Sequence, residues 1–144
     1  MTGIVATAEI DIDAPPDEVW SALTEPSRIK QYMFGSDVET DWQPGSPITW
    51  SGEFNGKAYQ DKGEVIAVEP GKRLEVTHFS PMSGAADKPE NYHRLIYALD
   101  ERGNGTRVEL SQDNNPDEQA AEHSRENWQT MLAGLKKHVE SSSR

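Results

Sequence analysis

The sequence predicts an α+β domain in which a curved antiparallel sheet of about seven strands wraps around one long C-terminal helix. Three observations carry this prediction. Proline-led helical segments follow a short first strand, Gly-containing turns divide the middle of the chain into strands, and apolar residues recur at helical spacing near the end. The 144 residues suit a single domain, 1–144, with a frayed tail expected at 141–144.

Two short helices are expected directly after the first strand. The segment IDAPPDEVW, residues 12–20, places two prolines and two acids where a first helical turn tolerates prolines and its dipole favours anions. This helix carries an apolar stripe that would anchor it against the sheet: Val19, Trp20 and Leu23. Pro26 begins the second helix, which we expect to end at Tyr32.

The C-terminal helix has the strongest start signal in the chain. Asn115 suits the N-cap, Pro116 the first helical position and Glu118 the third, and no breaker follows before about Glu140. Its apolar residues recur at helical spacing: Trp128, Met131, Leu132, Leu135 and Val139. Gly134 interrupts this face, either for a close backbone approach or to leave room on the helix face.

Turn signals divide the region between these helices into strands. Asn55-Gly56 favours a two-residue hairpin, and Pro70-Gly71 has the order that a type II turn prefers. Residues 100–106 contain a further Gly-rich reversal. The longer connection at residues 80–90 either gates a cavity near the start of the long helix or only links two strands.

These turns predict the strand register. The expected pairs are Gly52–Tyr59, Trp50–Asp61, Ala67–Leu74, Val65–Val76, Gly63–His78, His78–His93, Leu95–Gln112 and Tyr97–Leu110. One face then collects Ile48, Trp50, Phe54, Tyr59, Val65, Ala67, Leu74, Val76, Leu95, Tyr97, Leu99, Val108 and Leu110. The opposite face collects Thr49, Glu53, Gln60, Lys62, Glu64, Arg73, Glu75, Arg94, Arg107 and Glu109. Three residues break this alternation and are expected to cover an end of the sheet or mark a bulge: Ile66, Val68 and Ile96.

Composition excludes several classes of function. A formal net charge of −11 without a basic stripe makes nucleic acid and anionic membranes poor partners. The absence of cysteine removes disulfides and thiolate chemistry, and no apolar run approaches the roughly 20 residues that span a bilayer. The N-terminal sequence lacks a signal-peptide pattern, so a cytoplasmic location is expected. No metal-binding, phosphate-binding or dinucleotide motif occurs, so no metal or cofactor is expected.

Four polar residues fall on the apolar face of the predicted sheet: Asp61, His78, His93 and Gln112. They either orient a ligand's hydroxyl or carbonyl group, or lie solvated at an open end of the sheet, or satisfy each other in the core. An Asp beside a His can also exchange protons with a substrate. We expect at least two of the four to line one cavity.

The remaining ligand-binding candidates are aromatic or aliphatic: Trp50, Tyr59, Val76, Leu95, Tyr97, Trp128 and Leu132. Their aromatic members would clamp a planar ligand, and the alternative for each is ordinary packing in the core. A cavity must itself be lined by such side chains, so the two interpretations are compatible. No catalytic residue is assigned.

Four segments carry a resemblance to a known family: APPDEVWSALTEPSRIKQY (14–32), GEVIAVEPGKRLEVT (63–77), GTRVELSQ (105–112) and NWQTMLAGLKKHVE (127–140). The chain resembles the helix-grip superfamily of START lipid-transfer domains, polyketide cyclases and birch-pollen-type allergens. Within it, the chain is most similar to homologues of the activator of the heat-shock-protein-ninety ATPase. The sequence departs from that group at Tyr32, where Trp is usual, and at Gln112, where His is frequent.

The resemblance implies a cavity between the sheet and the long helix that holds apolar or aromatic small molecules. It leaves three hypotheses open: ligand binding or transport, a cyclase/aromatase-type enzyme using the neighbourhood of Asp61, His78 and His93, or a chaperone-linked or stress-related interaction module. A chaperone or homodimer contact is compatible with the third. The eukaryotic activators carry a separate N-terminal chaperone-binding domain that this sequence does not show, so direct ATPase activation is not expected.

Overall fold

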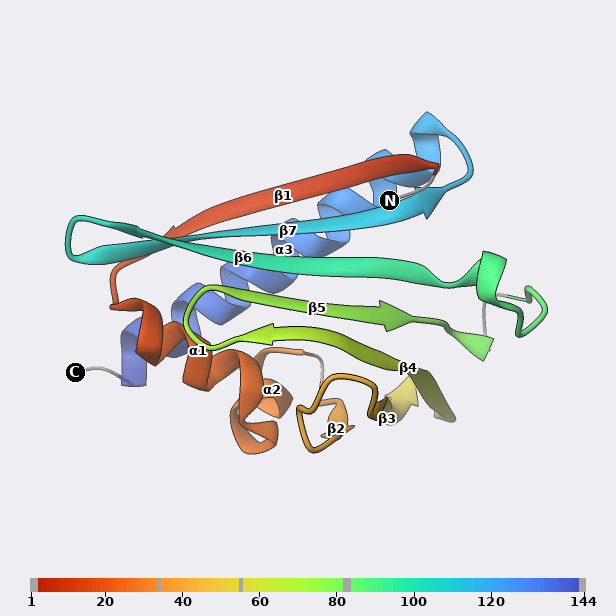
Figure 1. Ribbon diagram of the computed structural model, residues 1–144, viewed down its shortest axis with the longest axis horizontal. Helices are drawn as coiled ribbons and strands as arrows, with labels where there is room; N and C mark the ends of the chain where they lie inside the picture. The colour runs from red at the N-terminus through yellow and green to blue at the C-terminus, as the bar shows by residue number, and fades with distance from the viewer. Residues whose placement is uncertain (1–2, 34, 55, 82–83, 143–144) are drawn as a thin grey trace.

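The computed structural model describes residues 3–33, 35–54, 56–81 and 84–142. Their elements follow in the order β1 (Ile4–Ile12), α1 (Pro16–Thr24), α2 (Pro26–Tyr32), β2 (Asp37–Glu39), β3 (Pro47–Phe54), β4 (Lys57–Glu69), β5 (Arg73–His78), the 3-10 turn η2 (Pro89–Asn91), β6 (His93–Arg102), β7 (Gly105–Asn115) and α3 (Glu118–Ser142) (Figure 1). The α+β class, the two short helices after the first strand and the long final helix are confirmed.

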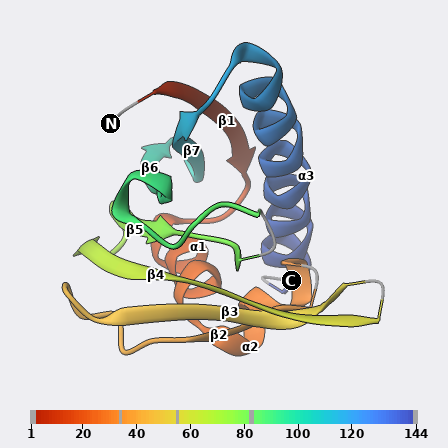
Figure 2. The same ribbon diagram turned by 90° about the vertical axis from the view of Figure 1, so that its right-hand side faces the viewer.

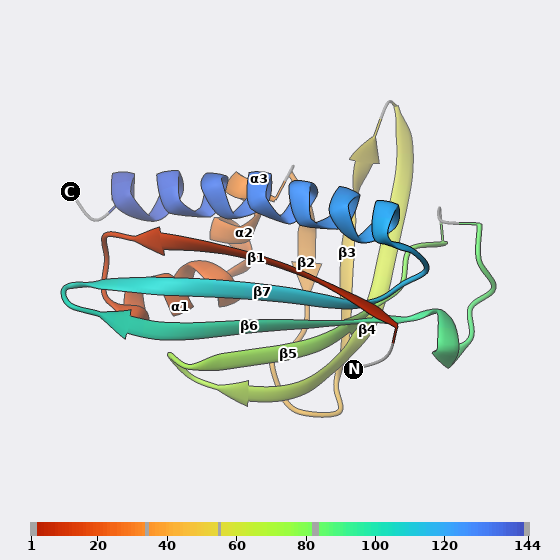
Figure 3. The same ribbon diagram turned by 90° about the horizontal axis from the view of Figure 1, so that it is seen from above.

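One antiparallel sheet contains all seven described strands in the order β1-β7-β6-β5-β4-β3-β2. The sheet curls so that α3 lies along its open side, with β2 and β3 across the base of the molecule (Figure 2). Seen from above, α3 runs along β1, and it makes its most extensive sheet contacts with that strand (Figure 3). This is the helix-grip arrangement. Within the described ranges, no helix is both long and apolar enough to cross a membrane.

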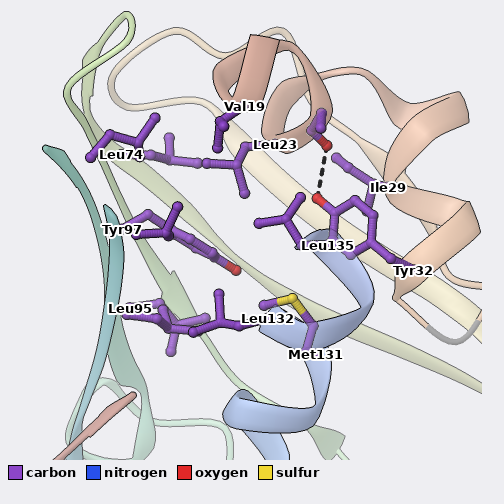
Figure 4. Close-up of a cluster of buried hydrophobic side chains, with 14 of the residues drawn as sticks. Val19, Leu23, Ile29, Tyr32, Leu74, Leu95, Tyr97, Met131, Leu132 and Leu135 are labelled. Atoms are coloured by element: carbon purple, nitrogen blue, oxygen red, sulfur yellow. Dashed lines mark hydrogen bonds between the residues drawn. The ribbon is translucent and has the colours of Figure 1, made fainter. Parts of the chain in front are cut away.

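The two short helices are packed as the apolar stripe predicts. Val19 is 0% exposed and Leu23 is buried, while Trp20 is partly buried and packs against the same core. The Tyr32 hydroxyl donates a hydrogen bond to the Ala22 carbonyl at 2.8 Å and ties α2 to α1 (Figure 4). Trp20 is therefore an anchor of the helix pair.

The start of α3 differs from the prediction. Asn115 is not an N-cap but the last residue of β7, where it pairs with Ile4 of β1. The side chain of Asp117 takes the capping role, because its Oδ1 accepts the backbone N–H of Ala120 at 2.7 Å. Asn and Asp both cap helices well. Asn115 does not cap α3 because its buried side chain is already hydrogen-bonded to the Ile4 and Gln112 carbonyls.

Most of the predicted register is confirmed. The pairs observed as predicted are Gly52–Tyr59, Trp50–Asp61, Val65–Val76, His78–His93, Leu95–Gln112 and Tyr97–Leu110. The bridge between Lys62 and Phe79 continues the β4–β5 pairing past Gly63, as the predicted pairing of Gly63 with His78 requires.

One predicted pair, Ala67 with Leu74, is wrong. Glu69 pairs with Arg73, so the turn between β4 and β5 contains three residues rather than two. An irregularity between Val65 and Ala67 absorbs the extra residue, and Leu74 pairs with Val68 instead. Val68 consequently packs against the core, which explains its break in the alternating pattern.

Several predictions concern positions outside the described residues. These are Asn55 of the predicted hairpin centre, the side chain of Phe54, residues 82–83 of the long connection and residues 143–144 of the predicted tail. The pairing of residues 54 and 57 fits a two-residue hairpin. The first half of the predicted tail, 141–142, is helical rather than frayed, because α3 continues to Ser142.

The two faces of the sheet differ as predicted, with two exceptions. Ala67, predicted on the apolar face, pairs with Glu75 of the outer face, because the irregularity after Val65 shifts the register by one residue. The apolar face is buried from Ile48 on β3 to Leu110 on β7. On the outer face, Glu75 is only 8% exposed although its strand position predicts a solvated side chain. Arg73 at 3.0 Å and Arg94 at 3.2 Å pair with its carboxylate and shield it from water.

His138 at the junction of the three helices gives the protein a pH-dependent stability. Arg28 Nε donates to His138 Nε2 at 3.1 Å, and burial together with the Arg28 charge lowers the pKa of His138, against a weaker opposing effect of Glu18. The unfolded chain therefore takes up this proton first as the pH falls below 6.5, and the folded protein loses stability until its own pKa is passed. In urea titrations from pH 7 to pH 5, His138→Gln should lose less stability than the wild type. An equal loss in both would contradict this assignment.

Candidate functional site

A cavity of about 750 Å³ lies between the curved sheet and α3. Its wall combines residues of the sheet, of α3 and of the segment after α2. The lining residues are Met33, Ser36, Trp50, Tyr59, Asp61, His78, Ser80, Leu95, Tyr97, Gln112, Ser124, Asn127, Trp128, Thr130 and Met131. About half of these residues are aromatic or aliphatic and the others are polar, so the wall can bury an apolar body and also form hydrogen bonds.

An Asp–His pair forms the most polar part of this wall. Asp61 Oδ2 lies 2.9 Å from His78 Nε2, and the two side chains are 19% and 22% exposed. The Trp50 ring meets the His78 ring edge-on with centroids 5.1 Å apart. The other carboxylate oxygen, Asp61 Oδ1, is buried and has no hydrogen-bond partner among the described residues.

A glycine makes this pairing between β4 and β5 possible. A Cβ atom at Gly63 would lie 1.8 Å from the Thr77 carbonyl oxygen and 2.5 Å from its carbon. No residue with a side chain fits there unless the strand backbones move apart. Gly63 therefore permits the close approach that holds Asp61 beside His78.

Gln112 anchors a second polar group at the β7–α3 side of the cavity. The Trp128 indole Nε1 donates to Gln112 Oε1 at 2.5 Å, and Gln112 Nε2 lies 3.4 Å from Ser124 Oγ. Ser124 in turn donates to Asn115 Oδ1 at 2.9 Å, and Asn115 Nδ2 donates to the Ile4 carbonyl at 2.9 Å. This chain of bonds fixes the orientation of both the Gln112 amide and the Trp128 ring.

Two tyrosines add hydroxyl groups to the wall. The Tyr59 hydroxyl lies 2.7 Å from Ser36 Oγ, which links β4 to the segment after α2. Burial raises the pKa of the Tyr97 hydroxyl well above its ordinary value, so this group stays protonated. The wall therefore presents two tyrosine hydroxyls in addition to the Asp–His pair and the Gln112 amide.

The structure brings eight of the eleven sequence-predicted site residues to this cavity: Trp50, Tyr59, Asp61, His78, Leu95, Tyr97, Gln112 and Trp128. Val76 and Leu132 are 2% and 0% exposed and belong to the packed core instead. His93 pairs with His78 in the sheet, but its Nδ1 lies 2.9 Å from the Asp113 carbonyl oxygen and it does not line the cavity. Three of the four polar candidates on the apolar face thus share one cavity.

Sequence reasoning missed the other lining residues: Met33, Ser36, Ser80, Ser124, Asn127, Thr130 and Met131. On α3, the positions 124, 127, 128 and 131 recur at helical spacing and form the strip that faces the cavity. Their polar members look like surface residues in the sequence, because a cavity wall tolerates polar groups that a packed core does not. Counting along the helix from Trp128 in steps of three and four residues could have identified positions 124 and 131 as lining residues.

The long connection contributes one lining residue, Ser80. Farther along, Asp87 pairs with Lys62 of β4, and the Tyr92 hydroxyl donates to Asp87 Oδ1 at 2.6 Å. These contacts fasten the connection to the outer side of the sheet. In the described part of the chain, no three His, Asp or Glu side chains lie close enough together to hold a metal ion.

Comparisons with known proteins fit this architecture. The family model described as Activator of Hsp90 ATPase homolog 1-like protein matches residues 13–140. The solution structure of ChR145 from Cytophaga hutchinsonii is 45% identical, covers 99% of this chain and 98% of its own, and superposes with a TM-score of 0.85. No curated protein matches the chain.

Two more distant structures share the fold. The solution structure of the Aha1 dimer from Colwellia psychrerythraea is 23% identical over 95% of this chain and 96% of its own, with a TM-score of 0.73. The crystal structure of CalU16 from Micromonospora echinospora is 24% identical. The match covers 96% of this chain and 87% of the CalU16 chain, with a TM-score of 0.72. The family match spans most of the chain, and the chain therefore belongs to the Activator of Hsp90 ATPase homolog 1-like family of helix-grip proteins.

Proposed function

We propose that this protein binds or carries a small, largely apolar or aromatic molecule in the cavity between the sheet and α3. The observation that carries the proposal is the cavity itself, whose 750 Å³ falls within the range of roughly 300–1,000 Å³ that small-molecule sites occupy. The core beside the cavity is well packed, since Leu132 and Leu135 of α3 are both 0% exposed. The cavity is therefore confined to one part of the space between the sheet and α3.

The aromatic side chains support a planar or ring-containing ligand. Trp50 and Tyr59 come from adjacent strands, Tyr97 from the middle of the sheet and Trp128 from α3. Rings from opposite walls can stack on a ligand or contact its edges, and each such contact adds to the burial of apolar area. Asp61 and Gln112 are two of the polar residues of the wall that would orient it.

Two measurements test this proposal. Native mass spectrometry of freshly purified protein should reveal a co-purified small molecule, and a naphthalene probe such as 2-naphthylmethanol should raise the melting temperature in a concentration-dependent way. Leu95→Trp, which places an indole on the cavity wall, should reduce this shift. Ile96→Trp is the matched control, because its side chain lies on the other face of the same strand.

An unchanged melting temperature with the probe, together with native spectra that show only the polypeptide mass, would count against ligand binding. A shift that Leu95→Trp and Ile96→Trp reduce equally would place the binding site elsewhere.

The second candidate is an enzyme of the cyclase/aromatase type. The 2.9 Å contact between Asp61 and His78 supports it, because such a pair can take a proton from a carbon acid and return one to a carbonyl oxygen. Under this hypothesis, Asp61→Asn abolishes conversion of the co-purified molecule while leaving its affinity largely intact. Conversion at equal rates by wild type and variant would exclude Asp61 from this role.

A self-association contact is the third candidate. Its support is the likeness to the Colwellia protein, whose solution structure is a dimer. An interaction module would display an exposed apolar patch, and among the described residues Val5, at 42%, is the only large hydrophobic side chain that is exposed. Light scattering after size-exclusion chromatography would show a mass of about twice the 16.0 kDa monomer if the contact forms.

A further inference from the structure

The hydroxyl of Tyr97 is buried in the cavity wall without a hydrogen-bond partner. Tyr97 is 6% exposed, and its hydroxyl makes no hydrogen bond within the described part of the chain. Burial is the cause that raises the pKa of this group, so it remains an O–H donor at every physiological pH. A buried donor without an acceptor is costly, and such groups in native structures call for an explanation.

This hydroxyl faces the cavity between the sheet and α3. In the described chain, Asp61 Oδ1 is the only fully buried side-chain polar atom that lacks a partner, so the unpaired Tyr97 oxygen has free space beside it. Tyr97 borders the cavity and also a void of about 20 Å³ beside α1 and α2. Its hydroxyl points toward α3 (Figure 4), and α3 contributes Met131 to the cavity wall but no described residue to the wall of the void.

The surroundings of the Tyr97 hydroxyl are apolar and uncharged. Leu95 precedes Tyr97 on the same face of β6, and Met131 lies across from it on α3. Among the described lining residues, none is a lysine or an arginine. The Asp–His pair lies at the other end of the cavity, because His78 is opposite His93, which is roughly 13 Å along the strand from Tyr97.

These surroundings determine which ligand group fits best at this end. A carbonyl or ether oxygen accepts the Tyr97 O–H and brings no donor of its own, so one hydrogen bond satisfies both groups. An alcohol would bring a second O–H, and one of the two donors would stay without an acceptor. A carboxylate would also accept the bond, but its charge would be buried without a cationic side chain to pair with it.

We infer that the ligand places an uncharged hydrogen-bond acceptor, such as a ketone, quinone, ester or ether oxygen, against the Tyr97 hydroxyl. The substrate class is therefore apolar or aromatic carbonyl compounds and ethers bound with the oxygen at the inner end of the cavity. This inference rests on the proposed function, since it concerns the same cavity.

The test uses three probes that share a naphthalene body. They are 2-acetylnaphthalene, its isosteric alkene 2-isopropenylnaphthalene, in which a CH2 group replaces the ketone oxygen, and 2-naphthoate. Calorimetric titrations give the affinity of the ketone relative to the alkene, and this ratio cancels the apolar contribution that both probes share. In Tyr97→Phe the ratio should fall about fivefold below that of the wild type, as expected for the loss of one hydrogen bond. The affinity of 2-naphthoate relative to the alkene should not change, because its charge stays away from this end.

Tyr32→Phe is the matched control. It removes another buried tyrosine hydroxyl, which donates to the Ala22 carbonyl and does not line the cavity. The ketone-to-alkene ratio should therefore stay at the wild-type value. Without any probe, Tyr32→Phe should lower the urea midpoint because the Ala22 carbonyl loses its donor, whereas Tyr97→Phe should not lower it.

The infrared carbonyl stretch of bound 2-acetylnaphthalene reports the hydrogen bond itself. Its frequency should be lower in the wild type than in Tyr97→Phe, because donation to the oxygen weakens the C=O bond.

An unchanged ketone-to-alkene ratio in Tyr97→Phe would overturn the inference and leave the proposed function standing, since the alkene still binds. A loss of 2-naphthoate affinity equal to that of the ketone would contradict the uncharged acceptor. A urea midpoint lowered as much in Tyr97→Phe as in Tyr32→Phe would show that the protein itself satisfies the hydroxyl, against the inference. Failure of all three probes to bind the wild type would contradict the proposed function, and the inference with it.

Discussion

Replacing Gly63 with alanine is expected to lower the free energy of unfolding by on the order of 3 kcal/mol. The new Cβ would lie 1.8 Å from the Thr77 carbonyl oxygen, an atom of the neighbouring backbone that cannot rotate away as a flexible side chain would. Strands β4 and β5 must separate locally to accept it. Because Asp61 and His78 lie on these strands, the same separation should weaken their contact and the binding of a ligand beside them.

Gly134→Ala is the matched control for this prediction, because it makes the same chemical change with the opposite expected sign. Its Cβ would meet the Cβ and carbonyl oxygen of Tyr32 at 3.5 Å, an ordinary van der Waals distance. Alanine is preferred over glycine inside a helix by up to about 1 kcal/mol, so this variant should be slightly more stable. Urea denaturation followed by circular dichroism measures both. A Gly63→Ala variant as stable as the wild type would show that the two strands are not held at this distance.

Leu132→Ala is expected to destabilise the protein by about 3 kcal/mol without changing its affinity for a cavity ligand. Leu132 is 0% exposed and points from α3 toward Leu95 on β6 (Figure 4). Truncating it leaves a void among packed neighbours, but its side chain does not line the cavity.

Met131→Ala provides the comparison at the adjacent position. Met131 also lies in the buried cluster, yet its side chain forms part of the cavity wall. Its truncation removes contacts with a bound molecule, so the affinity for 2-naphthylmethanol should fall, whereas Leu132→Ala should leave that affinity unchanged. Denaturation and calorimetry on the two variants separate the effects. Equal losses of affinity would mean that the core and the cavity wall are not distinct.

Much of the fold follows from local signals in the sequence. The prolines before Val19, the turn centres and the alternation of apolar residues are each set by neighbours close in the chain, and such signals are readable without tertiary information. The N-cap of α3 was predicted wrongly because two nearby residues suit that role locally and a contact distant in the sequence decides between them. Asn115 and Asp117 are both good caps, and only the buried partners of Asn115 in β1 and β7 assign the role to Asp117.

The site was predictable to the extent that it lies on the sheet. Asp61, His78 and Gln112 break the apolar pattern of one face, and the register then places them on the side that α3 covers. The helical half was not predictable in this way, because Ser124 and Asn127 are as polar as ordinary surface residues. For His93 the predicted strand pairing was right but the predicted role as a lining residue was wrong. A hydrogen-bond contact with the β7 backbone holds its side chain away from the cavity.

The tryptophan side chains offer the most direct test of the claim that this cavity binds an apolar molecule. Trp50 and Trp128 line the cavity, whereas Trp20 anchors α1 outside it. In a ¹H–¹⁵N NMR titration with 2-naphthylmethanol, the indole N–H signals of Trp50 and Trp128 should shift together and saturate, while that of Trp20 stays in place. A titration that leaves the Trp50 and Trp128 signals unmoved up to millimolar probe would contradict the account.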